Sequence, residues 1–233
     1  MVTKKKDTSG KKEGGAEKKP ATKKETTEKK KETAGKGGEI SASLVKELRE
    51  KTGLGMMDCK KALVETGGDL EKAVDYLRTS GALKAAKREG RATTEGRVGS
   101  YVHMTGKIGV LLELNCESDF VAKTEQFSAL LKDLCMHIAA SNPGWVSPEN
   151  VPAEVVAKEK EIYMNQAREA GKPDNILDKI AEGKLRKFYE ENCLLNQPFV
   201  KDTDKTIDQL VKDAIAQLGE NITIGRFVRF QIG

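Results

Sequence analysis

The stretch KIGVLLELNCESDFVAKTEQF, residues 107–127, contains a strand, a polar junction and the start of a helix. In its first half apolar residues recur at every second position, as in a strand: Ile108, Val110, Leu112 and Leu114. At the junction the acidic residue Asp119 precedes the large aromatic residue Phe120. Aromatic side chains are buried by default. Phe120 therefore either folds back into the core of this chain or enters the core of a partner.

Further strands and helices surround this stretch. Val98, Val102 and Met104 alternate before a turn at 105–106, which predicts a β-hairpin with the 108–114 strand. A third strand is predicted in residues 221–233, where apolar residues again have a period of two: Ile222, Ile224, Val228, Phe230 and Ile232. Four helical segments lie in between, at 127–138, 153–171, 173–192 and 204–219. This order predicts an α+β core, residues 97–233, with helices on one face of a three-stranded antiparallel sheet.

Residues 39–83 contain three short helical patterns, which we interpret as a three-helix domain followed by a polar linker, 84–96. Ser41 or Ser43 can cap the first helix, and Asp69 can cap the third. The second helix carries apolar residues at helical spacing: Met56, Cys59 and Leu63. Neighbouring residues on a helix point roughly 100° apart, so Met56 and Met57 cannot both face one core. We expect one of them to be exposed. An equal alternative is that both are partly buried and fill gaps in the core.

The basic character of the chain lies in its first 38 residues. They hold 13 lysines and 6 acidic residues, a net charge of +7, whereas the remaining residues carry −2, giving +5 for the whole chain of 233 residues. This lysine-rich tail has no aromatic residue, so it cannot bury enough surface to offset its ordering entropy. We predict that residues 1–38 are disordered. They either make a weak electrostatic contact with RNA or are a solvated extension.

Several functional classes are disfavoured by composition. The four cysteines stand far apart without a CxxC pair, and with only two histidines a zinc site is not expected, so we interpret the cysteines as buried free thiols. No apolar run approaches the length of a membrane span, and the start of the chain has no apolar segment of a secretory signal. No nucleophile–base set or phosphate-binding loop is present, so we do not expect an enzyme.

Six segments together resemble translation elongation factor Ts: ISASLVKELREKTGLGMMDCKKAL (40–63), GGDLEKAVDYLR (67–78), NCESDFVAK (115–123), MHIAAS (136–141), KPDNI (172–176) and NQPFV (196–200). The resemblance implies a ubiquitin-associated-like three-helix domain followed by an α+β core. It also implies a guanine nucleotide exchange factor for elongation factor Tu, acting on the GDP-bound and nucleotide-free forms of that GTPase. It implies no cofactor, metal or catalytic site in this chain.

The resemblance also implies functional residues. Four of them form the motif that dislocates Mg²⁺ from the partner: Ser118, Asp119, Phe120 and Val121. Others match positions that bind the partner: Lys46, Arg49, Met56 and Met57 in the amino-terminal domain, and His137 beside the motif. A histidine in an apolar helix is otherwise more often a hydrogen-bonded core or surface residue.

This chain departs from the family pattern in two respects. The motif usually begins with threonine, and Ser118 keeps the hydroxyl without the methyl group. Longer members have a second core subdomain and a coiled-coil-like insertion, whereas here one hairpin leads directly to MHIAAS, as in the short form. Some short members self-associate, which leaves a homodimer open. This partner implies that the protein is located in the bacterial cytoplasm. A plastid or a mitochondrion is the alternative location.

Two other interpretations come from parts of the sequence. GGDLEKAVDYL also suits a ubiquitin-like-binding module, which a pull-down with ubiquitin would reveal. The tail alone suggests a ribosome- or RNA-associated protein, and salt-dependent RNA binding that survives deletion of residues 1–38 would favour that interpretation.

Overall fold

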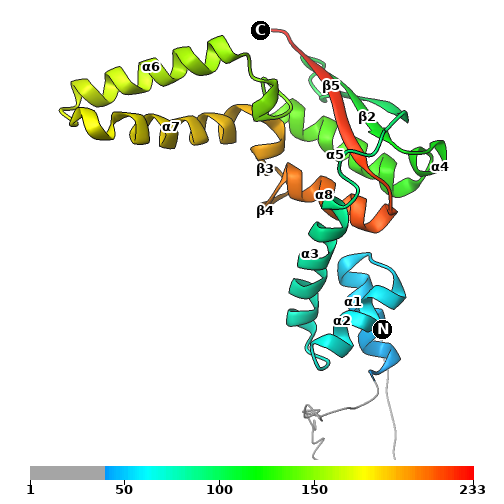
Figure 1. Ribbon diagram of the computed structural model, residues 1–233. Helices are drawn as coiled ribbons and strands as arrows, with labels where there is room; N and C mark the ends of the chain where they lie inside the picture. Colours follow the sequence, from blue (N-terminus) through cyan, green and yellow to red (C-terminus); the bar gives the residue numbers. More distant parts are fainter. Residues whose placement is uncertain (1–39) are drawn as a thin grey trace, which may run out of the picture. The chain divides into compact units, whose positions relative to one another are not determined.

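The structure is a computed structural model that describes residues 40–233, so the predicted lysine-rich tail lies outside the described residues. The described part contains eight α-helices, a three-stranded antiparallel sheet and a short two-stranded ladder (Figure 1). The predicted α+β class and three-stranded antiparallel sheet are confirmed. None of the helices in 40–233 is both long and apolar enough to cross a membrane.

The helices are α1 (Ala42–Thr52), α2 (Met56–Glu65), α3 (Leu70–Ala86), α4 (Asp119–Ala122), α5 (Glu125–Ser141), α6 (Ala153–Glu169), α7 (Leu177–Asn192) and α8 (Ile207–Leu218). Short 3-10 turns are η1 (Pro148–Asn150), η2 (Asp174–Ile176) and η3 (Leu194–Asn196). The strands are β1 (Glu95–Val102), β2 (Ile108–Cys116), β3 (Pro198–Phe199), β4 (Asp202–Thr206) and β5 (Ile222–Gln231).

The first three helices pack around a hydrophobic cluster of their own. Its buried members are Val45, Leu48, Cys59, Ala62, Leu63, Ala73 and Leu77. Ser41 rather than Ser43 caps α1, because its hydroxyl accepts the N–H of Leu44 at 3.2 Å. Asp69 caps α3 as predicted. The third helix continues to Ala86, three residues beyond the domain boundary expected from the sequence.

The sheet has the order β1-β2-β5, with both pairs antiparallel. Its buried face packs against α5, and at Gly99 in β1 the helix lies directly against the strand. A Cβ atom at Gly99 would lie 2.6 Å from Cγ of Leu131, so only glycine lets the helix approach the strand this closely. Strand β2 contributes Val110, Leu112 and Leu114 to the same core.

A β-bulge in β5 interrupts the alternation of side chains that the sequence pattern predicted for the whole strand. The pairing with β2 shifts between Leu112 and Leu114, so that β5 has one extra residue there. Because side chains alternate between the faces of a strand, one extra residue moves all later side chains to the opposite face. Ile222 therefore lies in the core, whereas Val228 and Phe230 are exposed. The predicted strand is confirmed, but its period of two does not extend through the bulge.

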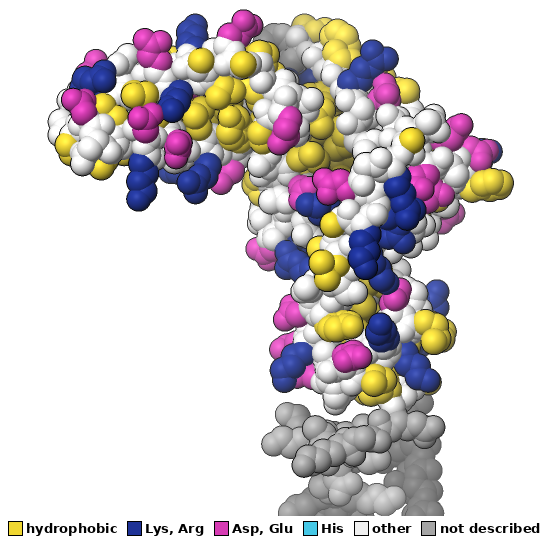
Figure 2. Space-filling view, viewed as in Figure 1, with side chains coloured by type: hydrophobic (Ala, Val, Ile, Leu, Met, Phe, Trp, Pro, Cys, Tyr) yellow, Lys and Arg dark blue, Asp and Glu magenta, His cyan; other side chains and the backbone are white. Residues whose placement is uncertain are grey.

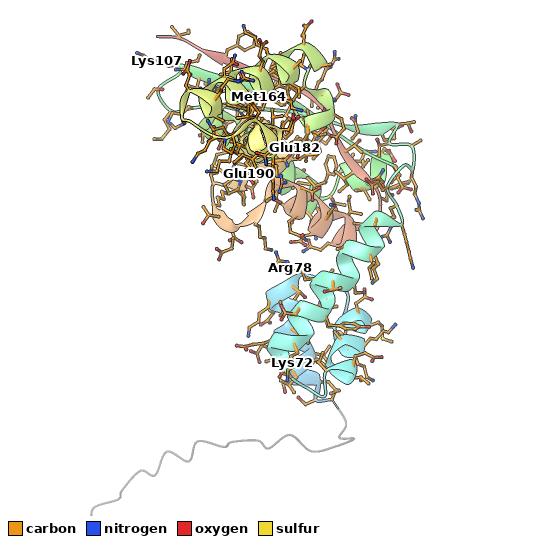
Figure 3. The ribbon with its side chains drawn as sticks, turned by 60° about the vertical axis from the view of Figure 1, so that its left-hand side comes forward. Lys72, Arg78, Lys107, Met164, Glu182 and Glu190 are labelled. Atoms are coloured by element: carbon orange, nitrogen blue, oxygen red, sulfur yellow. The ribbon has the colours of Figure 1, made fainter. Side chains whose placement is uncertain are left out.

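Helices α6 and α7 form an antiparallel pair that joins α5 to the C-terminal segment, residues 193–233 (Figure 1). The two helices contact each other, and Figure 3 labels Met164 on α6 and Glu182 on α7. Their small core is built from side chains such as Ala167, Ala181 and Leu185. The two helices were predicted from spacing at 153–171 and 173–192, and both are confirmed.

Candidate functional site

The acidic-aromatic stretch begins α4, a helix of only four residues that follows directly after β2. Ser118 is its N-cap: its backbone is extended, with φ −134° and ψ 156°, and its hydroxyl accepts the N–H of Val121 at 3.4 Å. A side-chain oxygen at this position satisfies a helix N–H group that has no partner within the helix. The cap therefore determines where the first side chains of α4 point.

Phe120 projects from α4 into solvent. Its side chain is 80% exposed, while the next two residues, Val121 and Ala122, are buried in the core. Single exposed apolar side chains are common on protein surfaces, but Phe120 is the most exposed phenylalanine of residues 40–233. Of the two alternatives that the sequence left open, the structure excludes burial of Phe120 in the core of its own chain.

Asp119 lies beside Phe120 and is paired with Lys123. The Asp119 Oδ2 atom accepts a hydrogen bond from Lys123 Nζ at 2.6 Å, across one turn. The carboxylate of Asp119 raises the pKa of Lys123, because it stabilises the charged ammonium group. Both side chains are largely exposed, so solvent screens this pair and it exchanges readily for other contacts.

A second partner of Ser118 was missed by sequence reasoning. The carboxylate of Glu220 accepts hydrogen bonds from the Ser118 N–H at 2.9 Å and from its hydroxyl at 2.6 Å. The two residues are 102 positions apart in the chain, and no local pattern marks Glu220. Only the antiparallel pairing of β5 with β2, which places Ile222 opposite Cys116, indicates that they meet.

A second candidate surface lies on the three-helix unit. Met56 and Met57 are 59% and 77% exposed, so the expectation that only one of the two would be exposed is wrong. They occupy the first turn of α2, and neither side chain belongs to the small hydrophobic cluster, whereas Cys59 of the same helix is buried in it. With basic neighbours they line a surface pocket of ≈ 550 Å³, whose other residues include Lys46, Arg49 and Lys60.

The space-filling view supports a mixed character for this unit. Figure 2 shows hydrophobic and basic side chains interspersed over the three-helix unit in the lower part of the described chain. Flexible thioethers adapt to the shape of a partner, and surrounding lysine and arginine side chains attract an acidic one. The predicted residues Lys46, Arg49, Met56 and Met57 therefore share one surface.

His137 lies in the core rather than on either surface. Its side chain in α5 is fully buried. The Val200 N–H donates to His137 Nδ1 at 3.4 Å, so His137 Nε2 carries the proton and donates to Gln197 Oε1 at 3.0 Å. Burial lowers the pKa of His137, because it disfavours the charged imidazolium. The predicted site residues thus form two groups, Ser118–Val121 and the α1–α2 pocket, and His137 belongs to neither exposed surface.

The cysteines are buried free thiols, as predicted. Burial raises the pKa of Cys135 and of Cys193 to about 11, so both thiols stay protonated at neutral pH. In residues 40–233 no group of three or more His, Cys, Asp and Glu side chains is arranged to hold a metal ion.

Comparison with known proteins identifies the family. A family model described as "Elongation factor TS" matches residues 71–233. The chain is 59% identical to elongation factor Ts of Nitratidesulfovibrio vulgaris over 194 residues, which cover 83% of this chain and 97% of that protein. It is 59% identical over 195 residues to elongation factor Ts of Fervidobacterium nodosum, with 84% and 99% covered, and 62% identical over 195 residues to that of an Anaeromyxobacter species, with 84% and 89% covered. The chain therefore belongs to the elongation factor Ts family of translation elongation factors.

Proposed function

We propose that this protein is a guanine nucleotide exchange factor for elongation factor Tu. It binds the GDP complex of that GTPase, dislocates its Mg²⁺ ion and promotes release of GDP, so that GTP can bind. The observation that carries this proposal is the exposed Phe120 on a capped four-residue helix. An apolar side chain held in solvent next to a carboxylate is suited to insertion into a partner, where both groups act together.

Phe120 supplies binding energy to a GTPase conformation that holds nucleotide poorly. Burying a phenylalanine side chain contributes about 1.5–3 kcal/mol, which corresponds to roughly a ten- to hundredfold change in an equilibrium constant. The coupling between two ligands is reciprocal, so a factor that weakens GDP is itself weakened by GDP to the same extent. The rest of the loss in GDP affinity comes from the other contacts of the complex.

Asp119 acts on the metal rather than on the nucleotide. The Mg²⁺ ion of the partner bridges phosphate oxygens and neutralises their charge. A carboxylate brought close to that site competes for the polar groups that orient the ion. In the free protein Asp119 accepts a hydrogen bond from Lys123, an exposed pair that is weak enough to open. In the proposed mechanism the partner holds both the metal and the nucleotide.

The three-helix unit provides the second contact. We propose a ubiquitin-associated-like domain, expected at 39–83, a linker, expected at 84–96, and a core domain, expected at 97–233; because α3 continues to Ala86 and β1 begins at Glu95, the segment between the two elements is 87–94. The support is that α1–α3 have their own hydrophobic cluster and expose the methionine pair beside basic residues. Two separated contacts increase the affinity without requiring the motif itself to bind tightly. His137 is buried in the core domain that carries the motif. We propose that it stabilises this core and does not contact the partner.

The outer face of the sheet supports a homodimer. Exposed apolar side chains gather on the face that α5 does not cover: Val98, Val102, Leu111, Val228 and Phe230. Val228 pairs with Leu111 across the strands, so their side chains share one face. A contiguous apolar face of this kind is typical of an interaction surface, and a twofold axis lets the same face bind itself. We propose that a second copy covers it.

The first prediction concerns Phe120. Phe120→Ala should slow stimulated GDP release about tenfold or more, because the ring is buried only in the complex. Its free energy of unfolding should change by less than about 1 kcal/mol, far from the 3–5 kcal/mol of a truncated core phenylalanine. Stopped-flow release of a fluorescent GDP and urea unfolding measure the two effects. Leu83→Ala, at another exposed apolar position, serves as the control. Unchanged GDP release would contradict the proposal.

The second prediction concerns the metal. Asp119→Ala should slow exchange when Mg²⁺ is present, and the defect should shrink when Mg²⁺ is chelated, because the ion it helps to dislocate is then absent. The same stopped-flow measurement with and without chelator tests this. An equal defect under both conditions would show that Asp119 contributes only to binding.

The third prediction concerns the α1–α2 pocket. Met57→Glu should weaken binding to nucleotide-free elongation factor Tu by about tenfold, since it replaces a buried thioether by a charge in the complex. The melting temperature should hardly change, because Met57 is exposed in the free chain and a carboxylate in the first turn suits the helix dipole. Calorimetry measures the affinity. Val64→Glu at the far end of α2 is the control, and an equal loss in that variant would exclude a specific pocket.

The fourth prediction concerns the sheet face. Sedimentation equilibrium should show a dimer that Phe230→Glu converts to a monomer with unchanged circular dichroism, because the introduced charge would be buried in the interface. Met104→Glu should remain dimeric, since Met104 is apolar and exposed but lies in the turn outside the strands. A monomeric unmodified protein would rule out this interface.

A further inference from the structure

Two segments that are far apart in the sequence hold each other at the start of α4. One segment, Glu117–Ser118, joins β2 to α4, and the other, Glu220–Asn221, joins α8 to β5. Ser118 donates to the Glu220 carboxylate twice, from its N–H at 2.9 Å and from its hydroxyl at 2.6 Å. In return the Asn221 N–H donates to Glu117 Oε1 at 2.6 Å. Each segment thus supplies a carboxylate that accepts the backbone N–H of the other.

The hydroxyl of Ser118 makes two hydrogen bonds, one as a donor and one as an acceptor, and Glu220 allows it to make both. A hydroxyl has one hydrogen to donate and lone pairs that accept. The hydrogen goes to Glu220 Oε1, which leaves a lone pair for the N–H of Val121. Glu220 therefore orients the group that caps α4. Because a hydrogen bond to a charged acceptor is stronger than one between neutral groups, this orientation is well defined.

Glu220 is itself fixed on both sides. Before it, Gly219 ends α8 in the left-handed conformation at φ +82°, and its N–H donates to Ile215 O at 3.0 Å. After it, the buried Asn221 donates from its side-chain amide to Arg91 O at 2.9 Å. Because the residues on both sides of Glu220 are held by hydrogen bonds, its carboxylate has a fixed position and can hold α4 in place.

We infer that Glu220 is a positioning residue for nucleotide exchange, which fixes the first turn of α4 so that Asp119 and Phe120 project in the geometry the partner accepts. The inference rests on the proposed function. Glu220 does not act on the partner directly in this scheme: its carboxylate is taken up by two hydrogen bonds from Ser118. Its effect should therefore exist only while the motif is intact.

The test is a double-mutant cycle in the full chain. Glu220→Ala should slow stimulated GDP release about threefold to thirtyfold. This is less than the roughly ten- to hundredfold that loss of a hydrogen bond to a charged group corresponds to, because the buried Val121 and Ala122 still hold the other side of the turn. In a chain that already carries Asp119→Ala and Phe120→Ala, the same change should slow release less than about twofold, because there is no motif left to position. Hydrogen exchange should show faster opening of the amides at 119–122 in Glu220→Ala.

Controls separate positioning from folding. Asp208→Ala removes a carboxylate that pairs with Lys212 within α8, and it should leave GDP release unchanged. Glu220→Gln keeps the shape and one acceptor, so it should fold and show a defect smaller than that of Glu220→Ala. An equal loss in the intact and motif-deleted chains, or no loss in either Glu220 variant, would overturn the inference while leaving the proposed function in place. Failure of the unmodified chain to accelerate GDP release would instead overturn the proposed function and this inference with it.

Discussion

A helix of four residues cannot hold an exposed phenylalanine in place by itself. Helix nucleation is unfavourable, and even helices of a dozen residues are marginal in water without tertiary contacts. The geometry of α4 therefore depends on the Ser118 hydroxyl, which accepts from Val121 and donates to Glu220. Burial of Val121 and Ala122 holds the other side of the turn. With both sides fixed, Phe120 projects on a rigid base rather than on a flexible loop.

Rigidity of this kind is what a nucleotide exchange factor needs. Binding energy that is used to order a loop in the complex is not available to deform the partner. The two surfaces of this protein differ in that respect. Phe120 stands on a capped and buried turn, whereas the methionine pair consists of flexible side chains at the start of α2. In the proposed function the adaptable surface would dock on the partner in several nucleotide states, and the turn that carries Phe120 would act in the step that distinguishes those states.

The secondary structure was predictable because it depends on local patterns. The alternation around Val110 and the helical spacing in α5 and α7 follow from residues that are close in the sequence. What could not be predicted depends on pairing between distant segments. The bulge in β5 is a property of its register with β2, and so is the meeting of Ser118 with Glu220. The exposure of Phe120 was undecidable for a different reason: burial is the default for an aromatic residue, and only the cap and the packing of its neighbours oppose that default.

The bulge also connects the fold to the proposed assembly. Without the extra residue, Val228 and Phe230 would continue the buried face begun by Ile222, and the outer face of β5 would carry the residues between them. Gly225 lies at the irregularity, in the segment of β5 between the partners of Leu114 and Leu112. A single inserted residue thus turns Ile222, beside the motif, toward the core and turns Val228 and Phe230, beyond the bulge, toward solvent. The sheet can therefore anchor α4 on one side and offer a surface to a second copy on the other, with each role assigned to a different part of β5.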